Sequence, residues 1–220
     1  KTYALCVPFV LDYIKNNPDY KTKHKKGAKA IWITPLRALS VEIKQATERF
    51  IEGMDVPLTV GIRTGDTSQK ERAAQKKDMP DLLITTPESL QLLLASKDYD
   101  KTFKNVAALV VDEWHELLGS KRGVQMELAL SRFKTIAPRL RIWGISATIG
   151  NLEQARQVLL GIHSEAYENS VLIRAKLKKK ITVKSIIPTK MEIFPWRGNL
   201  VSKVISVSSR FCWRYRDASW

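Results

Sequence analysis

The sequence predicts an α/β fold, a parallel sheet with helices on both faces, and three observations favour it. Short apolar segments alternate with helical segments along the chain, which is the order typical of parallel sheets. Residues 106–111 are all apolar and rich in valine, so they are expected to form a strand buried on both faces. Small polar clusters directly follow several predicted strands, and in a parallel sheet such ends share one edge.

The predicted strands and helices alternate along the chain. Strands are expected at residues 28–34, 56–62, 81–85, 106–111 and 140–145, with two more at 171–174 and 181–187. Helices are expected at residues 3–14, 36–50, 68–77, 87–94, 124–136 and 152–160. Thr86 and Asn151 are predicted N-caps, and Pro87 takes the first helical position, where its missing N–H is tolerated. Polar loops are predicted at residues 15–28 and 119–123, with His24 exposed in the first.

The composition favours a polyanionic partner. The 220 residues suffice for one α/β domain, and 44% hydrophobic with 27% charged residues is an ordinary globular balance. The net charge of +15 favours nucleic acid, because each neutralised phosphate releases counterions; a solvated lysine surface is the alternative. Cys6 and Cys212 form neither a disulfide framework nor a metal-binding spacing, which indicates a reducing, cytoplasmic location. No apolar run reaches membrane-span length and no signal-peptide order is present, so no membrane association is expected.

Two adjacent acids, Asp112 and Glu113, end the buried segment 106–111. On an extended chain their side chains point in opposite directions, so they can do different work. One can hold a magnesium ion, usually through water, and the other can orient or deprotonate an attacking water. His115 is placed to report the state of this site to a neighbouring segment. The competing interpretation is a strand that ends at a solvated acidic turn.

Other polar clusters are expected along the same edge of the sheet. Helix N-termini and hydroxyl groups suit phosphate oxygens, whereas carboxylates suit magnesium. The clusters that end predicted strands are Thr34-Pro35, Thr64-Gly65-Asp66, Thr85-Thr86-Pro87-Glu88, Asp112-Glu113 and Ser146-Ala147-Thr148. Their convergence predicts an edge that binds phosphates and magnesium together.

The order of these motifs resembles the first motor domain of a superfamily two DExH-box helicase, which has a RecA-like sheet. Closer likeness lies in Asp-Glu-Trp-His-Glu-Leu-Leu (112–118), Lys-Arg-Gly (121–123) and Trp-Gly-Ile-Ser-Ala-Thr-Ile-Gly-Asn (143–151), which resemble the Lhr (large helicase-related) family. Within it, the bacterial ligase-associated DExH-box enzymes match well. The resemblance implies a first motor domain over residues 1–175 and a connection toward a second motor domain over 176–207. Residues 208–220 form an atypical tail, either a natural C-terminus or a frameshifted reading.

The resemblance implies an ATP-dependent helicase or single-strand translocase that uses ATP and magnesium. Lys1 would neutralise the β- and γ-phosphates, and Thr2 would bind magnesium. Asp112 would hold the magnesium, and Glu113 would act as catalytic base. His115 would couple the nucleotide state to Ser146 and Thr148. Contacts to the backbone of single-stranded or partly duplex nucleic acid would come from Pro35, Leu36, Arg37, Thr64, Gly65, Asp66, Thr86 and Pro87. A DNA ligase and a nuclease of a repair set are the protein partners that it implies.

The sequence departs from the family at its first residues, because no glycine-rich phosphate loop precedes Lys1. The resemblance places the strand that feeds this loop between the strand ending at Asp112 and the strand ending at Ser146. We therefore expect either a slot beside residues 106–111 or direct pairing of that strand with residues 140–145. We also expect these 220 residues alone to lack ATP turnover and a stable fold. The alternative function is a nucleic-acid-binding remnant; a P-loop kinase is disfavoured, because it has no place for the clusters at Thr86 and Ser146.

Overall fold

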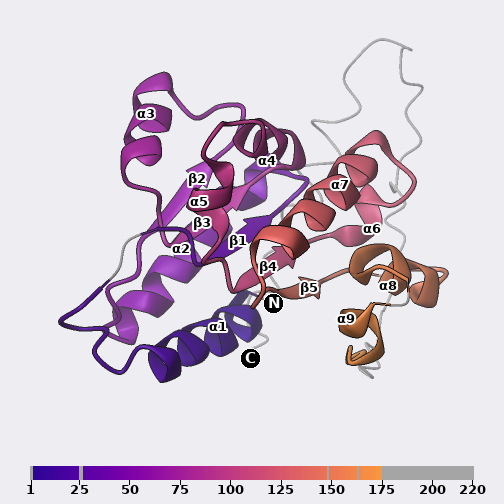
Figure 1. The fold of residues 1–220 in the computed structure, drawn as a ribbon, viewed down its shortest axis with the longest axis horizontal. Coiled ribbons are helices and arrows are strands. Elements are labelled where there is room, and N and C mark those ends of the chain that lie inside the picture. The colour runs from indigo at the N-terminus through magenta and orange to yellow at the C-terminus, as the bar shows by residue number, and fades with distance from the viewer. Residues whose placement is uncertain (1, 25–26, 148, 163, 175–220) are drawn as a thin grey trace, which may run out of the picture. The chain divides into compact units, whose positions relative to one another are not determined.

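The computed structural model describes residues 2–24, 27–147, 149–162 and 164–174 (Figure 1). The chain divides into two units, residues 1–172 and 173–220, and the sheet and all named helices belong to the first. The predicted strand at 181–187, the connection at 176–207 and the tail at 208–220 lie outside the described residues. Within the described ranges, every helix is too short or too polar to cross a lipid bilayer.

A five-stranded parallel sheet forms the centre of the fold, as the sequence predicts. Its strands are β1 (Ala30–Ile33), β2 (Val60–Arg63), β3 (Leu82–Thr85), β4 (Ala108–Val111) and β5 (Arg141–Gly144). The spatial order is β2-β3-β1-β4-β5, and every neighbouring pair is parallel. The prediction of a strand at residues 171–174 is wrong. Val171 and Ile173 are 84% and 89% exposed there, and residues 171–174 do not pair with the sheet.

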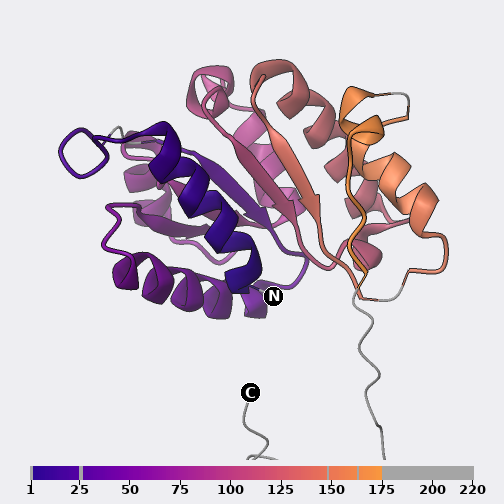
Figure 2. The ribbon, with the colours of Figure 1, turned by 90° about the horizontal axis from the view of Figure 1, so that it is seen from below.

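Helices cover both faces of the sheet (Figure 2). One face packs against α1 (Thr2–Asn16) and α2 (Arg37–Gly53). The opposite face packs against α4 (Pro87–Leu94), α5 (Tyr99–Phe103), α6 (Trp114–Leu117), α7 (Lys121–Ile136) and α8 (Leu152–Leu160). Alternate residues of β1 explain the two layers, because Ile31 and Ile33 join the second core whereas Ala30 and Trp32 join the first.

Local capping signals explain where several helices begin. The side chains of Thr86 and Asn151 accept hydrogen bonds from the N–H groups of Ser89 and Gln154, as predicted. The loop predicted at residues 119–123 is too long by three residues, because Ser120 caps α7 by accepting from the N–H of Gly123 and residues 121–123 are helical. Helices α5, α6 and the short α9 (Glu165–Glu168) were not predicted from the sequence, and they span only 5, 4 and 4 residues.

Strand β4 pairs directly with β5, with Val110 opposite Trp143. Of the two expected arrangements, a slot beside β4 or direct pairing, the structure therefore shows the second. The ladder continues past both strands, since the N–H of Ile145 donates to the carbonyl of Val111 at 2.9 Å. No row of unpaired backbone groups separates these two strands.

A buried polar cluster joins the amino ends of three strands. Asp81, 1% exposed, precedes β3 and accepts hydrogen bonds from the N–H and hydroxyl of Thr59 at 2.9 and 2.8 Å. Lys29 forms an ion pair with the same carboxylate, and His24 Nε2 lies 3.2 Å from it. The Tyr13 hydroxyl is hydrogen-bonded to His24 Nδ1 at 2.9 Å. The prediction of an exposed His24 was therefore wrong, because tertiary partners hold its ring.

Candidate functional site

Asp112 occupies the carboxyl end of β4 and is held in a fixed orientation. Its side chain is nearly buried, with the residue 6% exposed. The N–H of Glu113 donates to its Oδ1 at 2.9 Å, and the Trp32 indole N–H donates to its Oδ2 at 3.4 Å. The sheet therefore presents an oriented carboxylate at its carboxyl edge, as the sequence predicts.

Glu113 turns the chain sharply out of the sheet. Its backbone is left-handed, with φ 47° and ψ 44°, a region that residues other than glycine adopt uncommonly and often at functional sites. The prediction that Asp112 and Glu113 point in opposite directions assumed an extended chain, and this assumption is wrong because the backbone of Glu113 is not extended. The turn instead starts α6 and brings Glu113 Oε2 to 3.5 Å from His115 Nδ1.

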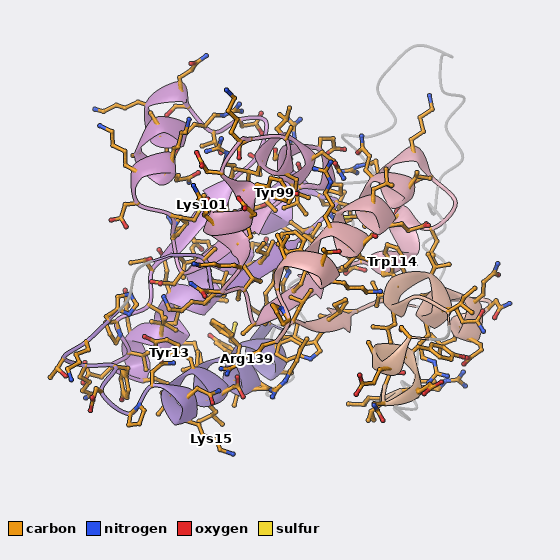
Figure 3. All side chains as sticks on the ribbon, viewed as in Figure 1. Tyr13, Lys15, Tyr99, Lys101, Trp114 and Arg139 are labelled. Carbon is orange, nitrogen blue, oxygen red and sulfur yellow. The ribbon has the colours of Figure 1, made fainter. Side chains whose placement is uncertain are left out.

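His115 and Ser146 meet across the ends of β4 and β5. The His115 Nδ1 atom and the Ser146 hydroxyl are hydrogen-bonded at 3.0 Å. The backbone reinforces this contact, since the Trp114 N–H donates to the carbonyl of Ile145 at 2.9 Å. The Trp114 indole N–H donates to the carbonyl of Ala155 and fixes α6 against α8 (Figure 3). The structure thus joins two residues that the sequence analysis paired, while their third partner, Thr148, lies outside the described residues.

The predicted nucleotide ligands lie at the start of the chain. Lys1 is outside the described residues, and Thr2 begins α1. Asp112 and the Thr2 hydroxyl supply oxygen atoms, the donors that magnesium prefers. In the described part of the chain no three His, Cys, Asp or Glu side chains cluster as a metal site. The donor chemistry therefore fits an ion that is held by one carboxylate, phosphate oxygens and water rather than by a protein cage.

The eight residues predicted to contact nucleic acid fall into two groups. Exposed ones follow β1 and β2: Leu36, Arg37, Gly65 and Asp66. The others, Pro35, Thr64, Thr86 and Pro87, are buried. In the exposed group, Leu36, Arg37 and Asp66 can offer side chains to a bound strand and Gly65 its backbone, whereas the buried group shapes the segments that carry them.

Arg37 and Asp66 bring the exits of β1 and β2 together. The Arg37 guanidinium donates to Asp66 Oδ1 at 2.9 Å, and both side chains are largely exposed, at 60% and 70%. A Cβ atom at Gly65 would lie 2.8 Å from Arg37 Nη2, so glycine leaves room for this guanidinium. The ion pair is exposed to solvent and connects the start of α2 to the loop after β2.

Two arginines organise this edge and were given no role from the sequence. Arg72, in α3 (Gln69–Lys77), donates to the carbonyls of Thr64 and Gly65 at 3.0 and 2.9 Å. Arg122, in the first turn of α7, donates to the carbonyl of Pro35 at 2.9 Å and pairs with the Glu88 carboxylate. No spacing in the sequence marks these contacts, although the Lys-Arg-Gly motif includes Arg122.

The Glu88 carboxyl shows the electrostatic effect of this arrangement. Partial burial on its own would raise the pKa of Glu88. Its own backbone N–H and the hydrogen bonds from Arg122 and Thr86 outweigh burial and hold the pKa below its usual range. Glu88 therefore remains charged and paired with Arg122 at neutral pH.

Comparison with known proteins identifies the family. Residues 1–155 match the DEAD/DEAH box helicase family, and this match covers more than half of the 220-residue chain. The chain therefore belongs to the DEAD/DEAH box helicases, whose motor domains share this RecA-like parallel sheet. Within the family its relatives include Lhr helicases, as the sequence resemblance indicated.

Two curated relatives and one solved structure define this likeness. The chain is 32% identical over 167 residues to the ATP-dependent helicase Lhr-Core of Methanothermobacter thermautotrophicus, covering 72% of this chain and 19% of that protein. It is 36% identical to the Lhr-Core helicase of Sulfolobus acidocaldarius, and the match covers 78% of this chain and 20% of that protein. The Mycobacterium smegmatis helicase Lhr, solved with single-stranded DNA and AMP-PNP, superposes with a TM-score of 0.57 at 31% identity and covers 71% and 21%. The chain thus spans about one fifth of the length of these relatives.

Proposed function

We propose that this chain carries motor-domain functions of an ATP-dependent helicase or single-strand translocase. The observation that carries the proposal is the shared edge, where Asp112, Glu113 and the His115–Ser146 contact adjoin loops with exposed polar groups. The family membership and the Lhr relatives support ATP use. Magnesium supplies neutralisation of phosphate charge when bound, and Asp112 and Thr2 are the oxygen donors that would hold it.

The carboxylates divide the chemistry between them. Asp112 is fixed by two hydrogen bonds, which suits a group that positions an ion. Glu113 leaves the strand and lies near the imidazole of His115, which suits a base that accepts a proton from the attacking water. His115 touches both Glu113 and Ser146, so it can pass a change at the hydrolysis site to the exit of β5.

Strand binding is proposed at the exits of β1 and β2. Arg37 offers a guanidinium to phosphate oxygens, and such contacts position a strand without reading its bases. The net charge of +15 favours a polyanion. A relative of this chain was solved with single-stranded DNA, which supports single-stranded or partly duplex nucleic acid as the partner.

The test is phosphate release by a purified longer protein that contains this chain together with a phosphate loop before Lys1, assayed with magnesium-ATP, with and without single-stranded oligonucleotide. Strand-stimulated turnover that Glu113→Gln lowers by about 10²- to 10⁴-fold would support the motor function. Asp112→Asn is expected to weaken the magnesium-dependent part of ATP binding as well. Turnover that survives Glu113→Gln would move the base elsewhere. Strand binding without turnover would favour the second candidate, a nucleic-acid-binding remnant.

We further propose a cytoplasmic setting in DNA repair, with a DNA ligase and a nuclease as partners. The support is the likeness of residues 112–123 to ligase-associated enzymes. Co-purification of a tagged chain with a ligase from its own host, resistant to nuclease treatment, would test the partnership. Loss of the ligase after nuclease treatment would contradict it, because both proteins would then only share DNA.

A further inference from the structure

We propose that Arg122 is a positioning residue that fixes the nucleic-acid edge and ties it to the hydrolysis segment; this inference rests on the proposed function. Its guanidinium reaches two segments far apart in sequence. Nη2 donates to the carbonyl of Pro35 at 2.9 Å, across 87 residues. Nε and Nη2 lie 2.6 and 3.3 Å from the two oxygens of the Glu88 carboxylate. One side chain thus sets the spacing between the loop after β1 and the first turn of α4.

The backbone leaves little freedom where Arg122 joins α7. A Cβ atom at Gly123 would overlap the carbonyl oxygen of Leu117, the last residue of α6. Ser120 closes the same turn, since its hydroxyl donates to that carbonyl at 2.7 Å and accepts from the N–H of Gly123. Helix α6 begins one residue after Glu113. Arg122 therefore stands on a rigid connection that starts at the hydrolysis segment.

Helices α4 and α7 lie side by side over the sheet (Figure 1), which keeps both ends of the Arg122–Glu88 pair in register. The Gln91 amide donates to the carbonyl of Gln125 at 2.5 Å, and Arg132 donates to the carbonyl of Leu94 at 2.9 Å. A displacement of α6 and α7 would therefore move Pro35 and α4 together. Leu36 and Arg37 follow Pro35 directly. The positions of these two exposed residues therefore depend on the contacts that Arg122 makes with Pro35 and Glu88.

The charge of Arg122 distinguishes positioning from direct phosphate binding. Glu88 already neutralises the guanidinium, and the pair is partly shielded, with side-chain exposures of 36% and 50%. A phosphate contact would require Arg122 to leave Glu88. A positioning role therefore predicts that losing Glu88 weakens strand binding, although the surface becomes more positive. Simple attraction to phosphate predicts the opposite.

The experiment measures anisotropy of a fluorescein-labelled oligothymidylate with the full 220-residue chain across a salt series. We expect Arg122→Gln to weaken binding by about tenfold, the effect of losing hydrogen bonds to a charged group. The slope of log affinity against log salt should stay unchanged. Glu88→Gln should weaken binding several-fold, and the double variant should bind no worse than Arg122→Gln. Arg122→Lys keeps the positive charge but loses the planar set of guanidinium N–H donors, so it should behave like Arg122→Gln.

Arg139→Gln is the matched control, because Arg139 is exposed at the amino side of β5 and loses the same charge (Figure 3). Thermal unfolding of each variant distinguishes loss of the fold from displacement of the loop after β1. If Arg122→Gln fails to fold, Glu88→Gln still tests the inference. Tighter binding by Glu88→Gln, or a salt slope reduced by about 1 in Arg122→Gln, would overturn the inference in favour of direct phosphate contact. If the wild-type chain binds the oligonucleotide and the Arg122 and Glu88 variants bind it with the same affinity, this inference alone is overturned. A wild-type chain that binds no oligonucleotide would overturn the proposed function, and this inference with it.

Discussion

Two groups of charged residues at opposite edges of the sheet, the Asp81 cluster and the Arg37–Asp66 pair, are built in opposite ways. At the amino edge, Asp81 is buried and satisfied by Thr59, Lys29 and His24. At the carboxyl edge, Arg37 and Asp66 pair with one another but remain mostly exposed. Both edges are built from the same parallel strands, so the difference lies in what packs over them. The 15-residue helix α1 and the loop that follows it close the amino edge through Tyr13 and His24.

This difference separates groups that hold the fold from groups that can bind a ligand. A buried carboxylate in a closed cluster stabilises the folded state, because removing one partner leaves an uncompensated charge. An exposed ion pair contributes little to stability, since water screens it. Its side chains can therefore exchange partners with a phosphate at small cost. The predictions below test this contrast between the edges.

The largest effect is expected from Asp81→Ala at the amino edge. The variant takes a buried partner from Lys29 and from His24, so it should lower the free energy of unfolding by about 3–5 kcal/mol. Urea or thermal unfolding measures this loss. Asp66→Ala, the same substitution at the carboxyl edge, is the matched control and should change stability by less than about 1 kcal/mol. Equal losses at both positions would refute the contrast.

Gly123→Ala should produce the next largest effect, because the carboxyl edge also depends on one tight packing contact. The added Cβ would overlap the Leu117 carbonyl oxygen, and relief requires α6 and α7 to move apart. Such overpacking destabilises by about 1–3 kcal/mol. Gly150→Ala is the control, since a Cβ there meets nothing within 4 Å. Unchanged stability in Gly123→Ala would show that α6 and α7 tolerate separation.

Arg37→Ala should weaken strand binding without loss of stability. Its ion pair with Asp66 is exposed, so the unfolding free energy should change by less than about 1 kcal/mol. Affinity for single strands should fall alike for all sequences, and the salt slope should decrease by about 1, as for one lost phosphate contact. Oligonucleotides of two unrelated sequences, titrated at several salt concentrations, provide the measurement. A sequence-dependent loss would instead indicate contact with bases.

The smallest effect is confined to alkaline pH. Burial raises the pKa of the Tyr13 hydroxyl, and the negative charge of Asp81 raises it further. The folded chain therefore keeps this proton at pH values where the unfolded chain has lost it. The resulting stability is complete below the unfolded pKa of about 10 and is lost as pH rises through the folded pKa. Tyr13→Phe should flatten this part of the stability curve; an unchanged slope between pH values of about 9 and 11 would contradict it.

The elements that depend on neighbouring residues were predictable from the sequence. Strand β4 followed from an all-apolar, valine-rich segment, and the caps at Thr86 and Asn151 followed from side chains that bond within three residues. The approximate places of β1, β2, β3 and β5 followed from the same alternation. The acidic pair at the end of β4 and its position at the carboxyl edge were also predictable, since parallel strands end together.

The tertiary structure alone decided which of these groups face solvent and which partners they find. Pro35 and Thr86 are buried whereas Leu36 and Arg37 are exposed, although all four end strands or begin helices. His24 joined Asp81 across 57 residues, and Arg122 reached Pro35 across 87. Periodicity and capping act over a few residues, so the sequence determined the elements and their chemistry at the edge. Contacts between distant residues form only when helices pack on the sheet, and this packing determined the division between a closed amino edge and an open carboxyl edge.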